Sequence, residues 1–249
     1  MTFGFLYYND KSALIQQILG WSEWPTELKL QIEFIVFDDC SSDDERAAGI
    51  IADVVDGLDL TVKVITAQPP KRTWNIGGGR NSIMSEAKGC WVMLMDIDFK
   101  VPVKLTQNIV SATRNSRKRQ VFKFTRIVPN KGIYFGKNGT QHPAIALLHR
   151  DLYWEAGGCD EDFVGAYGYT DPHFWFRLLQ HEIKPKIIVD VRWPSLLLVR
   201  TEEDPDFVWN RNKNTSRNSK IFQEKTSGSL AWSNNYLRFD RKVTTIGWE

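Results

Sequence analysis

Short apolar runs alternate with amphipathic segments along the first part of the chain, and this predicts a β-α-β-α-β order of elements. The strands are expected over residues 3–8, 32–37 and 60–65, with helices over 10–21 and 47–55 between them. Such an order favours right-handed crossovers and a parallel sheet. The pattern therefore predicts an α/β protein with a mostly parallel central sheet flanked by helices.

The most apolar run, residues 90–95, carries no charge and predicts a strand buried on both faces at the centre of the sheet. It ends in Asp96-Ile97-Asp98, at the edge where open α/β sheets bind ligands. Two such carboxylates can share a hard divalent cation whose other ligands are water and substrate phosphate. The alternative is that they only solvate a strand end and open a turn, which an isolated pair would favour.

A second acidic pair, Asp38 and Asp39, follows the second predicted strand and falls on the same edge of the sheet. One of the two would hydrogen-bond the base or ribose of a nucleotide, or the pair would only form a turn and cap the next helix. Ser42 and Glu45 have the spacing of a capping box for that helix.

Residues 67–79 are rich in proline, glycine and basic residues and are expected to form a long loop, with a helix opening at Arg80. The three glycines at its end allow close approach of the backbone to a ligand. Lys71, Arg72 and Arg80 would meet a diphosphate near the helix N-terminus. Flexible loops also use glycine without any ligand, so the glycine run alone does not define a site.

In the second half, residues 121–128 predict one strand and residues 150–156 a helix that Gly157-Gly158 ends. An acidic and aromatic loop follows, and Asp171 is expected as the N-cap of another helix with Pro172 as its first residue. Asp171 would either only cap that helix or act as a general base at the junction of loop and helix.

Composition narrows the class of protein. With 42% apolar and 25% charged residues, the chain resembles ordinary globular proteins, and its net charge of +2 gives no reason to expect nucleic acid as a partner. No apolar run approaches the roughly 20 residues of a transmembrane segment, and no signal peptide is recognisable. Three cysteines without metal-ligand spacing favour free thiols in a reducing cytoplasm.

Aromatic side chains are the other compositional feature, because the chain has ten tryptophans. They either pack in the core or offer flat faces for ligands, sugar rings among them. The candidates for such platforms are Trp74, Trp154, Tyr167, Tyr169 and Trp175.

Four motifs, in this order, resemble those of GT-A fold glycosyltransferases of family 2 and the related galactosyltransferase-type C-terminal module. They are Phe37-Asp-Asp-Cys-Ser-Ser-Asp43, Asn75-Ile-Gly with Arg80-Asn81, Gly89 before the strand that ends in Asp96-Ile-Asp98, and Gly157-Gly-Cys-Asp-Glu-Asp-Phe-Val-Gly165 with Gly168 and Asp171. The resemblance covers roughly residues 1–200 and implies the GT-A fold, which is Rossmann-like.

The resemblance implies metal-dependent transfer of a sugar from a nucleoside diphosphate sugar, with a UDP-sugar favoured, to a hydroxyl of a carbohydrate acceptor. Asp98 would bind Mn²⁺ or Mg²⁺ on the diphosphate, and Asp96 would lie closer to the ribose. Asp38 or Asp39 would contact the base or ribose, and Asp171 would deprotonate the acceptor, which gives inversion at the anomeric carbon. The family commonly has Glu-Asp where this chain has Thr170-Asp171.

The remaining assignments also follow from the resemblance. Residues 1–100 would bind the nucleotide sugar, residues 101–200 would serve the acceptor and catalysis, and residues 201–249 would be an extension that acts as a lid or packing arm. The donor site would include Lys71, Asn75 and Arg80, and the acceptor site Trp154, Asp160, Glu161 and Tyr169. His173 and His181 are candidates for a third metal ligand by residue type alone.

Two other classes of function stay open. The Thr170 departure keeps a catalytically degenerate nucleotide- or carbohydrate-binding module in consideration. A nucleotidyltransferase ranks lower, because residues 7–10 lack the glycine-rich signature that this class carries after its first strand. Retention of configuration by a different mechanism is also open.

Overall fold

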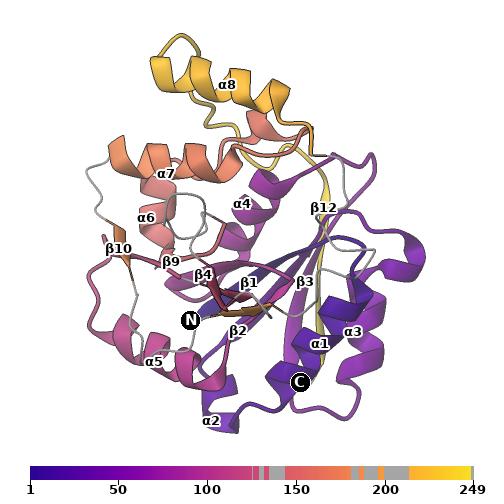
Figure 1. The fold of residues 1–249 in the computed structure, drawn as a ribbon. Helices are drawn as coiled ribbons and strands as arrows, with labels where there is room; N and C mark the ends of the chain where they lie inside the picture. Colours follow the sequence, from indigo (N-terminus) through magenta and orange to yellow (C-terminus); the bar gives the residue numbers. More distant parts are fainter. Residues whose placement is uncertain are drawn as a thin grey trace.

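An eight-stranded mixed sheet organises the computed structural model of this chain (Figure 1). The structure describes residues 1–124, 126–128, 132–134, 144–180, 185–187, 196–198 and 213–247. The strand order is β10-β6-β9-β4-β1-β2-β3-β12. The strands are β1 (Thr2–Tyr7), β2 (Glu33–Asp38), β3 (Thr61–Ala67), β4 (Trp91–Asp96), β6 (Val121–Lys123), β9 (Ala146–His149), β10 (Pro185–Ile187) and β12 (Arg241–Gly247).

Four parallel strands form the centre of this sheet. β1 pairs with β2 and β4, and β2 pairs with β3, all in parallel. β9 runs antiparallel between β4 and β6, and β12 runs antiparallel to β3 at the edge. The carboxyl ends of β1, β2 and β4 therefore meet at one edge, and the predicted α/β class with a mostly parallel centre is confirmed.

Helices cover both faces of the sheet. Side chains of α1, α3 and α5 pack in one apolar cluster, and side chains of α4, α6 and α7 pack in another on the opposite face. The helices are α1 (Lys11–Ser22), α2 (Thr26–Lys29), α3 (Ala47–Val55), α4 (Ile76–Glu86), α5 (Val103–Arg114), α6 (Arg150–Glu155), α7 (Thr170–Gln180) and α8 (Ser216–Ser227), with 3₁₀ turns η1 (Asp43–Glu45) and η3 (Glu161–Phe163).

The central strand β4 is buried on both faces, as its unbroken apolar run predicts. Met93 and Met95 belong to the cluster beneath α1 and α5, whereas Val92 and Leu94 belong to the cluster beneath α4 and α7. Because successive side chains of a strand point to opposite faces, both faces must be apolar for a helix layer on each side.

The glycine run 77–79 lies inside α4, so the predicted loop is shorter than expected and the helix begins at Ile76. The cause is close packing, because a Cβ on Gly79 would lie 2.6 Å from Phe37 and 2.7 Å from Leu6. Gly79 lets α4 approach β1 and β2, a role that composition alone does not distinguish from that of a glycine in a flexible loop.

The predicted capping box is wrong. Ser42 makes no side-chain capping hydrogen bond, and the backbone N–H of Ala47 at the start of α3 donates instead to Asp38 at 2.9 Å. Glu45 accepts hydrogen bonds from the backbone N–H of Lys11 at 2.9 Å and from the Tyr7 hydroxyl at 3.3 Å.

The single strand predicted over residues 121–128 is divided between two sheets. Its first part is β6, and its second part, β7 (Arg126–Val128), belongs to a smaller sheet of order β5-β11-β7-β8. The other strands of that sheet are β5 (Phe99–Lys100), β8 (Gly132–Tyr134) and β11 (Leu196–Leu198). β5 directly follows the Asp96-Ile97-Asp98 turn, so this sheet adjoins the candidate site.

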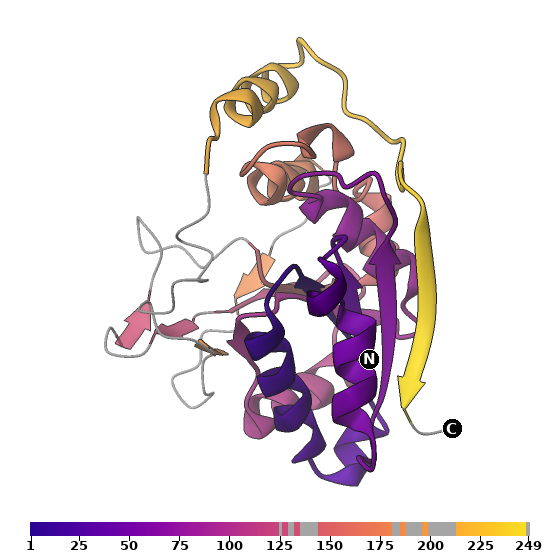
Figure 2. The same ribbon diagram turned by 90° about the vertical axis from the view of Figure 1, so that its right-hand side faces the viewer.

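The C-terminal segment returns across the body of the protein. α8 lies above α7, and β12 then runs along β3 at the edge of the sheet (Figures 1 and 2). The expected extension over 201–249 therefore supplies a strand of the central sheet, while its residues 201–212 lie outside the described part. None of the described helices is long and apolar enough to cross a lipid bilayer.

Candidate functional site

A cavity of about 410 Å³ opens at the carboxyl ends of the central parallel strands. Its position and size are those of ligand sites in open α/β sheets. The lining residues are Leu6, Tyr7, Tyr8, Asp10, Phe37, Asp39, Lys71, Thr73, Trp74, Asn75, Ile76, Arg80, Asp96, Ile97, Asp98, Phe99, Ala144, Tyr167, Gly168, Thr170, Asp171 and Lys213.

Asp38 and Asp39 have different surroundings. Asp38 is fully buried, and its two carboxylate oxygens accept hydrogen bonds from the backbone N–H groups of Ser41 and Ala47, each at 2.9 Å. Asp39 lines the cavity instead, and the backbone N–H of Asn75 donates to it at 3.3 Å. The structure therefore separates a helix-capping aspartate from one that faces the cavity.

Asn75 is 1% exposed, yet neither polar atom of its side-chain amide has a hydrogen-bond partner among the described residues. One oxygen of Asp39, Oδ1, is likewise buried without a partner there. Leaving such groups unpaired costs about 1–3 kcal/mol each, and both residues line the cavity. The amide N–H₂ of Asn75 as hydrogen-bond donor, and the side-chain oxygens of Asn75 and Asp39 as acceptors, fit a polar ligand such as a nucleobase or ribose.

Burial raises the pKa of Asp39 to about 7, although Lys71 and the Asn75 N–H favour its charged form. Asp38 adds to the increase, and Arg72 opposes it. A carboxyl group with this pKa changes charge near neutral pH and is sensitive to a ligand that donates a hydrogen bond to it.

Arg80 of α4 contacts two of the acidic residues that line the cavity. It forms an ion pair with Asp171, lies 3.9 Å from an oxygen of Asp96, and donates to the carbonyl of Ala144 at 3.1 Å. Arg80 is 3% exposed and its guanidinium is fixed by these contacts, so positive charge is held where Asp96 and Asp171 converge.

Asp171 lies in the first turn of α7, which begins at Thr170, two residues before the predicted first helical residue Pro172, so the prediction of Asp171 as the N-cap is wrong. Its carboxylate lines the cavity and is partly accessible, with 18% of the side chain exposed. Tyr169, just before the helix, has a positive φ of 64° and so turns the chain sharply into α7.

The side chain of Gln17 in α1 stabilises the Asp96-Ile97-Asp98 turn through hydrogen bonds. Its side-chain amide donates to the carbonyl oxygens of Ile97 at 2.8 Å and Phe99 at 2.6 Å, on either side of Asp98. Gln17 is 1% exposed. Sequence analysis missed this residue, because its position among the apolar residues of α1 indicates only burial and not the partner it meets.

Aromatic rings form another wall. The Lys71 ammonium lies 3.0 Å from the ring centroid of Tyr8, and the rings of Trp74 and Tyr167 meet edge to face at 4.9 Å. Tyr8 was not among the sequence candidates, whereas Trp74 and Tyr167 were. Trp175 does not line the cavity, because it packs in the core beside Phe174.

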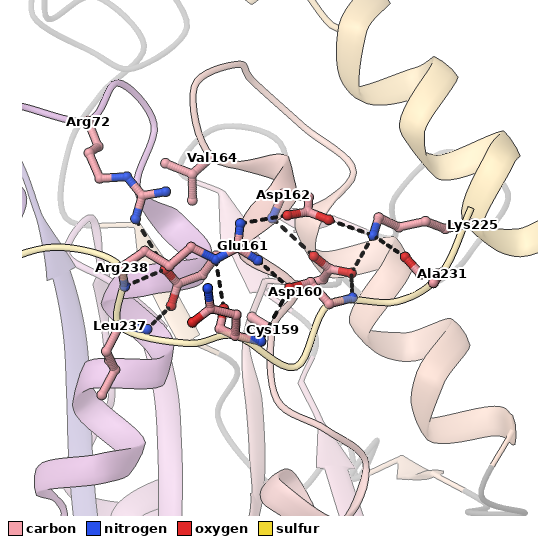
Figure 3. A network of polar contacts seen from close by, with 12 residues as sticks. Arg72, Cys159, Asp160, Glu161, Asp162, Val164, Lys225, Ala231, Leu237 and Arg238 are labelled. Carbon is pink, nitrogen blue, oxygen red and sulfur yellow. Dashed lines mark hydrogen bonds and ion pairs between the residues drawn. The ribbon is translucent and has the colours of Figure 1, made fainter.

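The four residues expected to bind the acceptor lie outside the cavity lining. Asp160 and Glu161 are each 1% exposed and fasten the C-terminal segment (Figure 3). Asp160 pairs with Lys225 at 2.9 Å, and Glu161 accepts hydrogen bonds from the backbone N–H groups of Leu237 at 2.6 Å and Arg238 at 3.2 Å.

The aromatic members of that set also contact the C-terminal segment. Trp154 packs against Tyr236 with ring centroids 5.3 Å apart, and Tyr169 packs against Phe222 of α8 at 5.2 Å. The structure thus brings these four residues to the interface with the C-terminal segment and not to the cavity.

The model of the family described as Glycosyl transferase family 2 matches residues 8–196 of the chain. The chain belongs to this family. The family assignment made from the four motifs is confirmed, and the galactosyltransferase-type part of the resemblance stays a prediction. No curated protein matches the chain in sequence.

Solved structures of glycosyltransferases share the fold of this family 2 chain. The S. aureus TarS 1–349 structure in complex with UDP-GlcNAc aligns with a TM-score of 0.63 and 14% identity, over 89% of this chain and 64% of that one. The mannosyltransferase PcManGT from Pyrobaculum calidifontis, in complex with GDP-Man and Mn²⁺, aligns with a TM-score of 0.59 and 14% identity, over 82% and 57%. The chain spans less than two thirds of either structure, and the likeness confirms the GT-A fold.

The divalent cation expected for this family 2 chain is compatible with Asp96 and Asp98, which both line the cavity. Magnesium-type cations usually take one or two protein carboxylates and complete their shell with water and substrate phosphate. No group of three or more His, Cys, Asp or Glu residues is arranged to hold a metal within the described part of the chain. A two-carboxylate site is therefore the arrangement that the residues fit.

His173 lies away from the cavity lining, on the side of α7 that faces α8. It is fully buried, and its ring meets those of Phe163, Phe222 and Trp232 at centroid distances of 4.9, 6.4 and 6.0 Å. Burial lowers the pKa of His173 to about 4, so the ring is neutral near pH 7. The structure separates it from Asp96 and Asp98, and His181 lies outside the described residues.

Proposed function

We propose that the chain transfers a sugar from a nucleoside diphosphate sugar to a hydroxyl group of a carbohydrate acceptor, with inversion and with a divalent cation. The observation that carries this proposal is the convergence of Asp39, Arg80, Asp96, Asp98 and Asp171 on one cavity in a family 2 glycosyltransferase. The complexes of similar structures with UDP-GlcNAc and GDP-Man support a nucleotide sugar as the donor.

The donor would lie across the strand ends. Asp39 and the unpaired amide of Asn75 would bind the base or ribose, and Lys71 lies beside them over the ring of Tyr8. A divalent cation bound by Asp96 and Asp98 would supply positive charge to the departing diphosphate. Arg80, held by Asp96 and Asp171, would add a fixed cation at the same end.

Asp171 is the proposed general base. It would accept the proton of the acceptor hydroxyl while that oxygen forms a bond to the anomeric carbon of the donor sugar. The bond between that carbon and the diphosphate oxygen breaks, and the nucleoside diphosphate leaves with the electron pair. Attack from the face opposite the leaving group inverts the configuration.

A catalytically degenerate binding module is the second candidate, and a specific contact favours it. Asp171 forms an ion pair with Arg80, and Thr170 replaces the glutamate expected before it. If Asp171 serves only to pair with Arg80, it would stabilise the structure of the donor site and would not act as a base. A glycosyltransferase and a degenerate binding module would both bind the nucleotide, but only the glycosyltransferase would turn over the donor sugar.

Asp171→Asn separates them. With UDP- and GDP-sugars and a panel of glycan acceptors, we expect this variant to lose at least about 100-fold in transfer rate while nucleotide affinity stays within about threefold. Asp151→Asn, at an exposed position of α6, is the matched control and should keep full activity. Turnover by Asp171→Asn at the wild-type rate would remove Asp171 from the mechanism, and wild-type protein that binds nucleotide without turnover would favour the degenerate module.

A further inference from the structure

Lys213 brings the C-terminal segment to the cavity. Of the described residues that line it, Lys213 alone lies beyond residue 196, where the match to the family model ends. Its ammonium group lies 5.5 Å from the ring centroid of Tyr167, which in turn contacts Trp74. A cation that family membership does not account for is thus positioned on the wall of the candidate donor site.

The position of Lys213 depends on the start of α8, which is firmly attached to the loop before α7. Asn218 is fully buried and donates to the carbonyl oxygens of Phe163, Ala166 and Gly168 at 2.8–2.9 Å. Arg217 donates to Val164 in the same loop at 3.1 Å. Because this loop leads into Asp171, the contacts fix Lys213 and the proposed base relative to each other.

The far end of α8 is anchored by a buried charge cluster. The ammonium of Lys225 reaches Asp160 at 2.9 Å, Asp162 at 2.8 Å and the carbonyl of Ala231 at 2.8 Å (Figure 3). Its three donors therefore meet three acceptors, which a fully buried lysine requires. Both ends of α8 hold the segment that begins with Lys213 against the body of the protein.

The cavity lining carries more carboxylates than cationic side chains, so binding of a negatively charged diphosphate there requires additional positive charge. Five carboxylates line it, those of Asp10, Asp39, Asp96, Asp98 and Asp171, against three cationic side chains. Of these three, Lys71 lies over Tyr8 and Arg80 is engaged by Asp171. Lys213 is the third, and its ammonium lies on the cavity wall beside the ring of Tyr167.

We propose that Lys213 binds the diphosphate group of the donor, so that α8 completes a site whose other residues lie within the family 2 domain. This inference rests on the proposed function, because it assigns a ligand group to the same cavity. In the reaction, the ammonium would stabilise the negative charge that develops on the leaving diphosphate.

The test compares a nucleoside diphosphate with its nucleoside. For whichever of UDP or GDP the wild-type protein binds, affinity is measured by calorimetry, and affinity for uridine or guanosine by saturation-transfer NMR. Lys213→Gln should weaken diphosphate binding about 10- to 100-fold, the range expected for a charge-assisted hydrogen bond, and change nucleoside binding less than twofold. Lys213→Arg should restore most of the diphosphate affinity.

The matched control is Lys220→Gln, which removes the same charge from α8 at a position where 78% of the side chain is exposed. It should leave both affinities unchanged, and thermal unfolding should show that all variants are folded. Equal loss of diphosphate and nucleoside binding in Lys213→Gln, or no loss of either, would overturn the role of Lys213 and leave the proposed function standing. A wild-type protein that binds neither UDP nor GDP would overturn both.

Discussion

Asp38 and Asp39 are neighbours in sequence with opposite orientations. Asp38 ends β2, and its oxygens face the turn that leads into α3, whereas Asp39 lies one residue beyond the strand and faces the cavity. The environment of Asp39 predicts a pH dependence that an ordinary surface aspartate would not give.

Nucleotide affinity should rise with pH through the pKa of Asp39, which is about 7. Its pKa is raised, so the carboxylate is protonated at pH 6 and ionised at pH 8, and a base or ribose that donates a hydrogen bond to it binds the ionised form. We expect wild-type affinity to be about tenfold higher at pH 8 than at pH 6, measured by calorimetry.

Asp39→Asn is the control for titration of the nucleotide phosphate itself. This variant should bind more weakly at pH 8 and should retain only the pH dependence that belongs to the ligand. Identical pH profiles for wild type and Asp39→Asn would show that Asp39 does not face the bound nucleotide.

At the scale of elements, α1 supports the acidic turn through Gln17. In Gln17→Leu the carbonyl oxygens of Ile97 and Phe99 lose this donor, and we expect the free energy of unfolding to fall by roughly 2–4 kcal/mol. Because Asp98 lies between the two carbonyls, Mn²⁺-dependent nucleotide binding should weaken more than metal-free binding.

Gln16→Leu is a suitable control, since Gln16 contacts only Ser12 of its own helix among the described hydrogen bonds. Denaturant unfolding and calorimetry with and without Mn²⁺ measure both effects. If Gln17→Leu and Gln16→Leu behave alike, α1 does not position the acidic turn.

The attachment of α8 depends on Lys225. Burial alone would raise the pKa of Asp162, but hydrogen bonds from Lys225 and Arg238 bring it below its usual value. Lys225→Met would leave the buried Asp160 carboxylate without its cation, and we expect a loss of about 3–5 kcal/mol in the free energy of unfolding.

Lys220→Met on the exposed face of α8 should change the free energy of unfolding by less than about 0.5 kcal/mol. Urea denaturation of both variants measures the difference. A Lys225→Met protein as stable as wild type would mean that this buried cluster does not hold α8 in place.

At the scale of the whole molecule, the sequence was sufficient for the features that depend on local periodicity. The apolar run that becomes β4 and the β-α-β-α-β order predicted the sheet and the edge where ligands bind, because both follow from which residues must be buried. The same reasoning placed Asp39, Asp96 and Asp98 at one edge. Arg80 was added by the glycine-rich loop before it and Asp171 by the family resemblance, and all five line the cavity.

The features that the sequence could not predict depend on tertiary contacts between residues that are far apart in the chain. Composition did not reveal that Gly79 is pressed against Phe37, or that β12 pairs with β3 across some 180 residues. Asp160 and Glu161 have the composition of a binding loop, and only tertiary contacts with Lys225, Leu237 and Arg238 identify them as anchors of the C-terminal segment.

The central claim is that this cavity binds a nucleoside diphosphate through a divalent cation held by Asp96 and Asp98. Calorimetric titration of UDP and of GDP, each with and without Mn²⁺, tests it directly on wild type and on Asp98→Ala. We expect one nucleotide to bind the wild-type protein with an affinity that Mn²⁺ increases at least about tenfold, and we expect Asp98→Ala to lose this increase. A folded wild-type protein that binds neither nucleotide, or an Asp98→Ala variant with the same response to Mn²⁺, would contradict the claim.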